Sequence, residues 1–287
     1  MMPDMEKNLA EDTSTLFDIK NIARQIAQDI ILCSLSKSGF FKKAVLHGDK
    51  ARRLQFGLGG LPGHLECSLN EADTSFKISS LLPCIEQGLL GYGLKFRPEI
   101  REKTLEDNVQ SMILRSNSRE VVKTLFKMEK LAENISDTDM IKVKFELNVV
   151  PSKYAVTETK LMSFPEKYEI RMYDKASLFA EKINNTICRA WRGRTKGCDL
   201  LDYTFYLSNG VHYNHKHLVE RLMDSNYVEA KPEMTFEEVK ANLCYRFREI
   251  NYEQSKIDLL PFIGNPELLD MWDPKYFCNI TEDLKSV

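Results

Sequence analysis

Residues 44–50 read AVLHGDK, a short apolar run that stops at a glycine. The apolar residues predict a β-strand, and Gly48 predicts a tight turn directly after it. Because glycine carries no side chain, the backbone at such a turn can approach a phosphate group closely. A single glycine is weak evidence by itself, and an ordinary turn is the alternative interpretation.

A second strand is predicted over residues 64–69, where apolar residues alternate with polar ones. Alternate residues of a strand point to the same face, so His64 and Glu66 should project together, near the Gly48 turn if the two strands pair. Carboxylates placed in this way hold the divalent ions of phosphoryl-transfer sites. Histidine is a poor partner for magnesium, which prefers oxygen ligands. The alternative is a plain surface strand.

A third strand is predicted over residues 141–150, which alternate strongly between apolar and polar side chains. Glu146 lies on the polar face of this strand and is a candidate third acidic ligand. Lys142 and Lys144 share that face, so an ordinary face of cross-strand ion pairs is the alternative.

Lys182 lies among apolar residues of a helix predicted over residues 175–191. Its ammonium could reach a phosphate as a point charge, although lysines in such positions more often extend to solvent. Residues 189–199 form the most basic segment of the chain, which suggests phosphate or RNA contact, with a solvated loop between helices as the alternative. Asp199 and Asp202 begin the next helix and could simply cap it.

Two other clusters have simpler interpretations. Asp137 and Asp139 have D-x-D spacing, but they lie in a polar loop with no glycine–strand element upstream, which predicts a turn. His212, His215 and His217 crowd together, but no cysteine or paired carboxylate completes a metal set. We interpret the histidines as the start of a helix.

The remaining pattern divides the chain into a mixed α/β part and a helical part. Residues 1–14 are predicted to be a disordered lead, and Pro83 should kink or split its helix. Helices are predicted over residues 17–35, 50–56, 75–90, 119–131, 175–191, 199–207, 215–224 and 236–250, and further strands over 94–97, 108–114, 155–162 and 168–172. We expect an α+β fold with a lead and amphipathic helix in residues 1–37, an α/β core in 38–172 and a helical part in 173–287.

The net charge, the cysteine count and the lack of long apolar segments exclude several classes of protein. The net charge is −2 over 287 residues, so any contact with nucleic acid must come from a local basic patch. The seven cysteines are odd in number and contain no C-x-x-C pair, which argues against a disulfide framework or a zinc ribbon. No secretory signal begins the chain, and no apolar stretch is long enough to span a membrane. We expect a cytoplasmic protein with no membrane contact.

The order of these motifs resembles that of the AbiEii-type nucleotidyltransferases, the toxin half of bacterial type IV toxin–antitoxin pairs. The most specific segments are SLFAEK at residues 177–182 and RTKGCDLLD at residues 194–202. There the family shows leucine-phenylalanine-alanine-x-lysine, then lysine-glycine-arginine-aspartate with a second aspartate three residues on. The run LLPFI at residues 259–263 and the strand with Lys142, Lys144 and Glu146 are also family-like. The resemblance spans residues 37–277.

The chain departs from the family at several motif positions. GDK at residues 48–50 stands where the family has glycine-glycine-serine or -threonine, and HLE at residues 64–66 stands where it has aspartate-x-aspartate. Asn148 and Cys198 replace a further aspartate and an arginine. The family's residues are kept at Gly48, Glu146, Lys182, Lys196, Asp199 and Asp202. Because the departures cluster at the proposed site while the framework is kept, they indicate a degenerate enzyme.

The resemblance implies a nucleotidyltransferase core, a small mixed sheet flanked by helices, followed by a helical half. It implies transfer of a nucleotide from a nucleoside triphosphate to RNA, such as a tRNA end, with Mg²⁺ or Mn²⁺ as cofactor. It assigns the metal to Glu66, His64 and Glu146, the triphosphate to Gly48, Lys50, Lys182 and Lys196, and catalysis to Lys182, Asp199 and Glu146. Asp199 or Asp202 would orient Lys182 or act as the base.

Three hypotheses therefore stay open. The first is an enzyme, whose activity should be weak because a strong metal ligand is missing. The second is a catalytically inactive protein that binds nucleotide or RNA, or that pairs with an antitoxin protein. The third is a scaffold kept for protein contacts. The family's place in toxin–antitoxin systems and phage defence implies a cognate antitoxin as a possible partner in the first two cases.

Overall fold

The computed structural model describes residues 15–58, 63–101, 108–188, 196–227, 229–260, 263 and 265–287. The chain divides into two compact units. The first, here called the sheet unit, comprises Met1–Arg53, Gly57–Pro151 and Thr159–Met172, and the second, the helical unit, comprises Leu54–Phe56, Ser152–Glu158 and Tyr173–Val287. The predicted lead over residues 1–14 lies outside the described residues.

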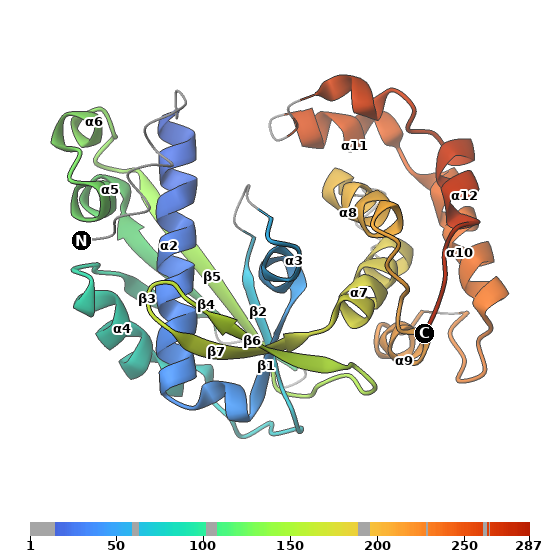
Figure 1. Ribbon diagram of the computed structural model, residues 1–287, viewed down its shortest axis with the longest axis horizontal. Coiled ribbons are helices and arrows are strands. Elements are labelled where there is room, and N and C mark those ends of the chain that lie inside the picture. Colours follow the sequence, from blue (N-terminus) through green and yellow to red (C-terminus); the bar gives the residue numbers. More distant parts are fainter. Residues whose placement is uncertain are drawn as a thin grey trace. The chain divides into compact units, whose positions relative to one another are not determined.

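A single mixed sheet organises the sheet unit (Figure 1). Among the described residues its order is β3-β4-β5-β2-β1-β7-β6. The strands are β1 (Ala44–His47), β2 (Leu65–Leu69), β3 (Arg97–Arg101), β4 (Val109–Asn117), β5 (Met140–Asn148), β6 (Thr157–Met162) and β7 (Tyr168–Tyr173). The pairs β2–β5 and β1–β7 are parallel, whereas β1–β2, β3–β4 and β4–β5 are antiparallel. The predicted α+β fold with a mixed sheet flanked by helices is confirmed.

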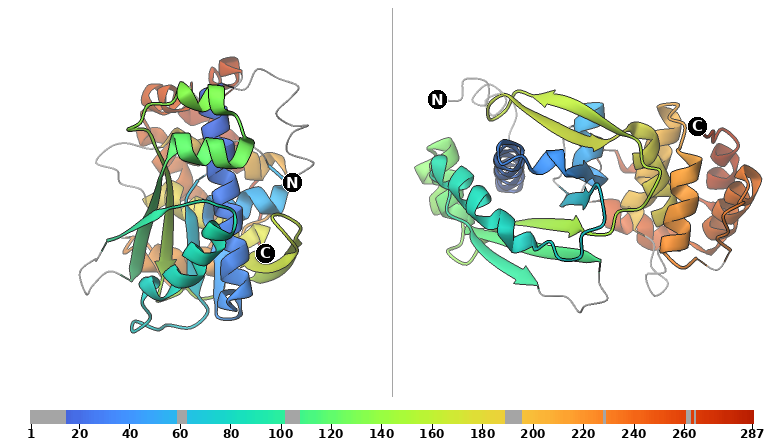
Figure 2. Two further views of the ribbon diagram at one scale, coloured as in Figure 1. Left: turned by 90° about the vertical axis from the view of Figure 1, so that its left-hand side faces the viewer. Right: turned by 90° about the horizontal axis from the view of Figure 1, so that it is seen from below.

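The helices of the sheet unit bury the apolar face of the strands. They are α2 (Leu16–Lys37), α4 (Leu82–Gly91), α5 (Ser118–Phe126) and α6 (Glu129–Glu133), and α3 (Gly48–Phe56) follows β1. Helix α2 begins with a capping box between Thr15 and Asp18 and packs against α4 and β5. Its first turns meet α5 and α6 in a cluster that includes Ile19, Val122 and Ala132 (Figure 2, left).

The helical unit is held together by aromatic side chains. Its elements are α7 (Lys175–Cys188), α8 (Gly197–Ser208), α9 (His215–Asp224), α10 (Phe236–Glu249), α11 (Tyr252–Leu259) and α12 (Pro274–Thr281). Phe179 stacks on Tyr206 with ring centroids 4.7 Å apart, and the buried Tyr203 hydroxyl lies 2.8 Å from the hydroxyl of Thr281. Buried aromatic rings contribute large apolar areas, and a hydroxyl partner removes the cost of burying the phenol oxygen.

Several predicted elements differ from the observed ones. The helix predicted over residues 75–90 is a 3-10 turn (Ile78–Leu81) followed by α4, which has Pro83 in its first turn, where the missing N–H costs no helical bond. The helix predicted over residues 119–131 is two helices, because Lys127 has a φ of 58° and ends α5. The strand predicted over residues 94–97 begins only at Arg97. Helices α11 and α12 were not predicted.

Within the part of the chain that the structure describes, no helix is both long enough and apolar enough to cross a membrane.

Candidate active site

The Gly48 turn holds the first part of the site. Strand β1 pairs with β2 so that His47 lies opposite Glu66, and Gly48 then turns the chain into α3 with a φ of 69°. This left-handed conformation favours glycine. A Cβ atom at Gly48 would lie 2.5 Å from Oε2 of Glu66. The glycine therefore serves both the turn and the space that the Glu66 carboxylate occupies.

Glu146 lies beside Glu66. Strands β2 and β5 are parallel, and their register places Glu66 directly opposite Glu146. The two side chains therefore leave the same face of the sheet from strands about 4.8 Å apart. Oε1 of Glu146 lies 2.7 Å from Nζ of Lys144, and both side chains are partly exposed. The structure thus brings together the glycine turn and two of the predicted acidic ligands.

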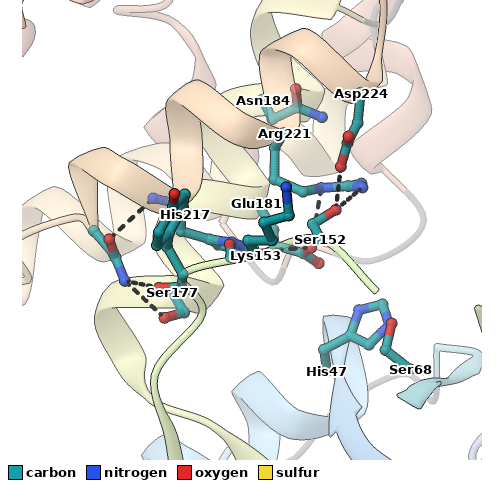
Figure 3. A network of polar contacts seen from close by, with 12 residues as sticks. His47, Ser68, Ser152, Lys153, Ser177, Glu181, Asn184, His217, Arg221 and Asp224 are labelled. Carbon is teal, nitrogen blue, oxygen red and sulfur yellow. Dashed lines mark hydrogen bonds and ion pairs between the residues drawn. The ribbon is translucent and has the colours of Figure 1, made fainter. Parts of the chain in front are cut away.

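Further polar side chains extend this line of residues across the sheet. His47 on β1, Glu66 on β2, Glu146 on β5 and Ser111 on β4 occupy directly opposed positions, and we call these four residues the carboxylate row. Nε2 of His47 also lies 3.5 Å from Oγ of the buried Ser68 (Figure 3). Sequence reasoning missed His47, although its position immediately before the turn glycine was a usable signal.

His64 lies outside the strand ladder. The predicted strand over residues 64–69 begins at Leu65, and His64 is exposed one position earlier. The physical reason is that β1 ends at His47, which pairs with Glu66, because Gly48 turns the partner chain away. The assignment of His64 to a metal stays a prediction.

Lys50 has a structural contact in the sheet unit. Its buried ammonium forms an ion pair with Asp29 of α2. Burial raises the pKa of the Asp29 carboxyl, and the nearby Lys50 charge opposes this shift. The pair connects α3 to α2, so contact between Lys50 and a phosphate, which stays a prediction, would require the ammonium to leave Asp29.

Lys182 and its aspartates form a buried cluster in the helical unit. Nζ of Lys182 on α7 lies 2.7 Å from Oδ2 of Asp202 and 3.2 Å from Oδ1 of Asp199, both on α8. The side chains of Lys182, Asp199 and Asp202 are 11%, 1% and 7% exposed, so the lysine does not extend to solvent. The two helices therefore fix the position of the Lys182 ammonium between two carboxylates, and the formal charges of the three groups sum to about −1.

The other predicted residues of this region are only partly described. Lys196 is exposed at the N-cap position of α8, and the basic residues 189–195 lie outside the described residues. His217 is buried, with Nδ1 2.8 Å from the carbonyl oxygen of Lys153, and lies near the ion pair between Glu181 and Arg221 (Figure 3). These contacts indicate a packed polar network of the helical unit.

The aspartates of the D-x-D spacing stabilise the fold. Asp139 accepts hydrogen bonds from Lys20 and Ser118 at 2.6 Å each, and these contacts lower the pKa of its carboxyl, the bond from Lys20 having the larger effect. Asp137 pairs with Arg119. Both residues hold the start of α5, as expected for a structural turn.

The carboxylate row fits a metal ion that arrives with a phosphate ligand. No group of three or more histidine, cysteine, aspartate or glutamate side chains able to hold a metal occurs among the residues with described positions. Glu66 and Glu146 supply two adjacent carboxylates, and Mg²⁺ commonly binds through one or two carboxylates together with substrate phosphates and water. Because the donors are oxygens, the pair suits Mg²⁺ or Mn²⁺ better than zinc.

Gly48→Ala should destabilise the sheet unit more than Gly57→Ala. Both glycines have a left-handed φ, 69° and 66°, so both variants carry a similar backbone cost of about 1–2 kcal/mol. A Cβ at Gly57 meets nothing within 4 Å, whereas one at Gly48 collides with the Glu66 carboxylate. Urea unfolding should therefore give a larger loss for Gly48→Ala, by up to about 1 kcal/mol, since the Glu66 carboxylate is the end of a flexible side chain and can partly move aside. Equal losses would show that Glu66 does not fill the space above the turn.

The comparisons with known proteins give information on the fold alone. No family model and no curated protein matches the chain. The crystal structure of JHP933 from Helicobacter pylori is similar with a TM-score of 0.51 and 17% identity, covering 92% of this chain and 93% of that one. A crystal structure of a protein described as a candidate nucleotidyltransferase from H. pylori has a TM-score of 0.48 and 16% identity, covering 91% of both chains. The chain therefore shares the fold of JHP933 over nearly its whole length.

Proposed function

We propose that the chain is a nucleotidyltransferase of the AbiEii type, which transfers a nucleotide from a nucleoside triphosphate to RNA. One observation carries the proposal: Glu66 and Glu146 lie side by side on parallel strands, next to a glycine turn that leaves room for the Glu66 carboxylate. Two adjacent carboxylates beside a glycine turn are the donors that a metal–triphosphate complex requires. The resemblance in the motif order supports the same activity.

The residues divide the chemical work between them. Glu66 and Glu146 would hold Mg²⁺ or Mn²⁺, which, when bound, neutralises the charge that develops on the transferred phosphate. The backbone at Gly48 would lie against the triphosphate. Lys182, with its charge fixed by Asp199 and Asp202, would steady a phosphate, and Lys196 would add a second cation. The roles of Lys182 and Lys196 rest on the family resemblance.

The test is transfer of radiolabel from nucleoside triphosphates to total tRNA with Mg²⁺ or Mn²⁺. We expect slow transfer by the wild type and a fall of about a hundredfold or more in Glu66→Gln and Glu146→Gln, since removing a metal ligand costs about 3 kcal/mol of transition-state stabilisation. His64→Asp should increase transfer by restoring a carboxylate. Glu71→Gln, which changes an exposed carboxylate of the sheet unit, is the matched control.

Absence of transfer by the wild type, with none recovered in His64→Asp, would contradict an enzymatic role. The tRNA acceptor and an antitoxin partner are finer parts of the proposal. Transfer to other RNA but not to tRNA would contradict only the tRNA acceptor.

A second function is favoured by the ion pair at Glu146. The Lys144 ammonium lies 2.7 Å from this carboxylate, at a place where a metal ligand would need its oxygens free for the ion. If the pair persists, the site can bind nucleotide through a positive charge without a divalent ion. The chain would then be a catalytically inactive nucleotide- or RNA-binding protein.

A further inference from the structure

The face of the sheet that carries the carboxylate row also carries a row of cations. Arg97 on β3 lies opposite Arg115 on β4, and Arg115 lies opposite Lys142 on β5. These three residues, here called the basic row, are an even number of positions from Arg101, Ser111 and Glu146 on their own strands. Their side chains therefore project from the same face as Glu146.

The two rows lie a fixed distance apart. Lys142 and Glu146 are four positions apart along β5, which corresponds to roughly 13 Å at about 3.3 Å per residue. Between the rows lie Glu99, Ile113 and Lys144, in one register line. One end of the face thus carries three cations, and the other carries Glu66 and Glu146 together with Arg101 of β3, which lies opposite Ser111.

Packing three cations side by side needs a physical reason. Like charges directly opposite one another across a strand pair are destabilising. Charged side chains are common on edge strands, where they discourage pairing with other chains, and this accounts for Arg97 on the exposed β3. It does not account for Arg115 and Lys142, which lie on inner strands. Arg115 has a counter-charge in Glu99, so Lys142 is the cation of the row for which neither reason holds.

The basic row is accessible. Arg97 and Lys142 are exposed, and Arg115 is 31% exposed while it pairs with Glu99 at 2.8 Å. A cavity of about 540 Å³ opens beside the row and is lined in part by Lys95, Arg97 and Arg115. A polyanion could therefore reach these guanidinium groups without any movement of the strands.

We propose that this face binds the phosphates of single-stranded RNA, which crosses β3, β4 and β5 from the basic row toward the carboxylate row. An extended polyanion matches both the length of the face and its row of cations, whereas a small anion would occupy only one end. The positions of β3, β4 and β5 on this face hold no aromatic side chain to stack on bases, so binding there is electrostatic and independent of base sequence. That the RNA end reaches the carboxylates rests on the proposed function, but the binding does not.

The test measures binding of a fluorescein-labelled oligouridylate by anisotropy, without nucleoside triphosphate. The variant Arg97→Gln/Arg115→Gln/Lys142→Gln should bind at least about tenfold more weakly at low salt, and its plot of log affinity against log salt should be shallower by about 2, at about 0.7 per lost phosphate contact. The matched control is Lys77→Gln/Lys130→Gln/Lys167→Gln, which removes the same charge from exposed positions outside β3, β4 and β5. It should leave the affinity within about twofold of wild type, because more distant charges are screened by salt.

Glu99→Gln should change the RNA affinity in the opposite direction, because it removes a negative charge and leaves every cation in place. It takes away the carboxylate between the rows, so RNA binding should become tighter. Oligocytidylate should bind as tightly as oligouridylate. Equal losses in the two triple variants, or no RNA binding by the wild type, would overturn the proposal.

Glu66→Gln separates this proposal from the proposed function. It should lose nucleotide transfer without weakening RNA binding, because it removes no cation of the basic row. A wild-type protein that binds RNA as predicted but transfers nothing would refute the enzyme and leave the binding surface standing.

Discussion

Lys182→Met should destabilise the helical unit by about 3–5 kcal/mol, the largest effect that we expect from a single substitution. The substitution keeps an unbranched side chain that is shorter only by the terminal atom, and it removes the ammonium. The carboxylates of Asp199 and Asp202 then remain buried without the cation that lies 3.2 and 2.7 Å from them. Breaking a buried pair from one side takes a close cation away from each buried carboxylate, which costs far more than loss of a surface ion pair.

Thermal and urea unfolding measure this loss, and Lys216→Met is the matched control. Lys216 is an exposed lysine of α9, and its replacement should change stability by less than about 0.5 kcal/mol. The double variant Lys182→Met/Asp202→Asn should recover part of the loss, because it removes one of the two charges. A Lys182→Met protein as stable as Lys216→Met would show that the cluster does not hold α7 and α8 together.

Gly197→Ala should destabilise the same unit by about 3 kcal/mol. Gly197 begins α8, and a Cβ atom there would lie 2.1 Å from the carbonyl oxygen of Ser255 and 2.8 Å from Cγ of Leu259, both on α11. A backbone carbonyl within a helix cannot swing aside as a side chain can. The two helices would have to move apart, and overpacking of this kind outweighs the better helix propensity of alanine.

Gly91→Ala is the control for this prediction. Gly91 is also helical, but a Cβ atom there meets nothing within 4 Å, so the variant should be as stable as wild type or slightly more stable. Unfolding temperatures of the two variants give the comparison. If Gly197→Ala and Gly91→Ala have the same unfolding temperature, α8 and α11 do not approach each other as closely as described here.

Local patterns predicted the strands that form the site, but not their partners. The alternation over residues 64–69 and 141–150 correctly predicted buried apolar faces on β2 and β5. Nothing in either segment indicates that the two strands pair in parallel, because that pairing joins residues about eighty positions apart. The adjacency of Glu66 and Glu146 depends on that long-range register.

The same limit applies to residues that sequence reasoning missed. The basic row becomes visible only when the register of β3, β4 and β5 is known, whereas His47 had a local signal in its place before Gly48. For Lys182, an apolar helical neighbourhood fits an ammonium in solvent as well as one held by aspartates. The meeting of α7 with α8 decides between them.

The most direct test of the central claim, that Glu66 and Glu146 form a metal–triphosphate site, is calorimetric titration with a non-hydrolysable nucleoside triphosphate analogue. The account predicts binding that requires Mg²⁺ or Mn²⁺, is lost in Glu66→Gln and Glu146→Gln, and is kept in Glu71→Gln. Binding of equal affinity in the presence of a chelator, unchanged by the two glutamine substitutions, would contradict it.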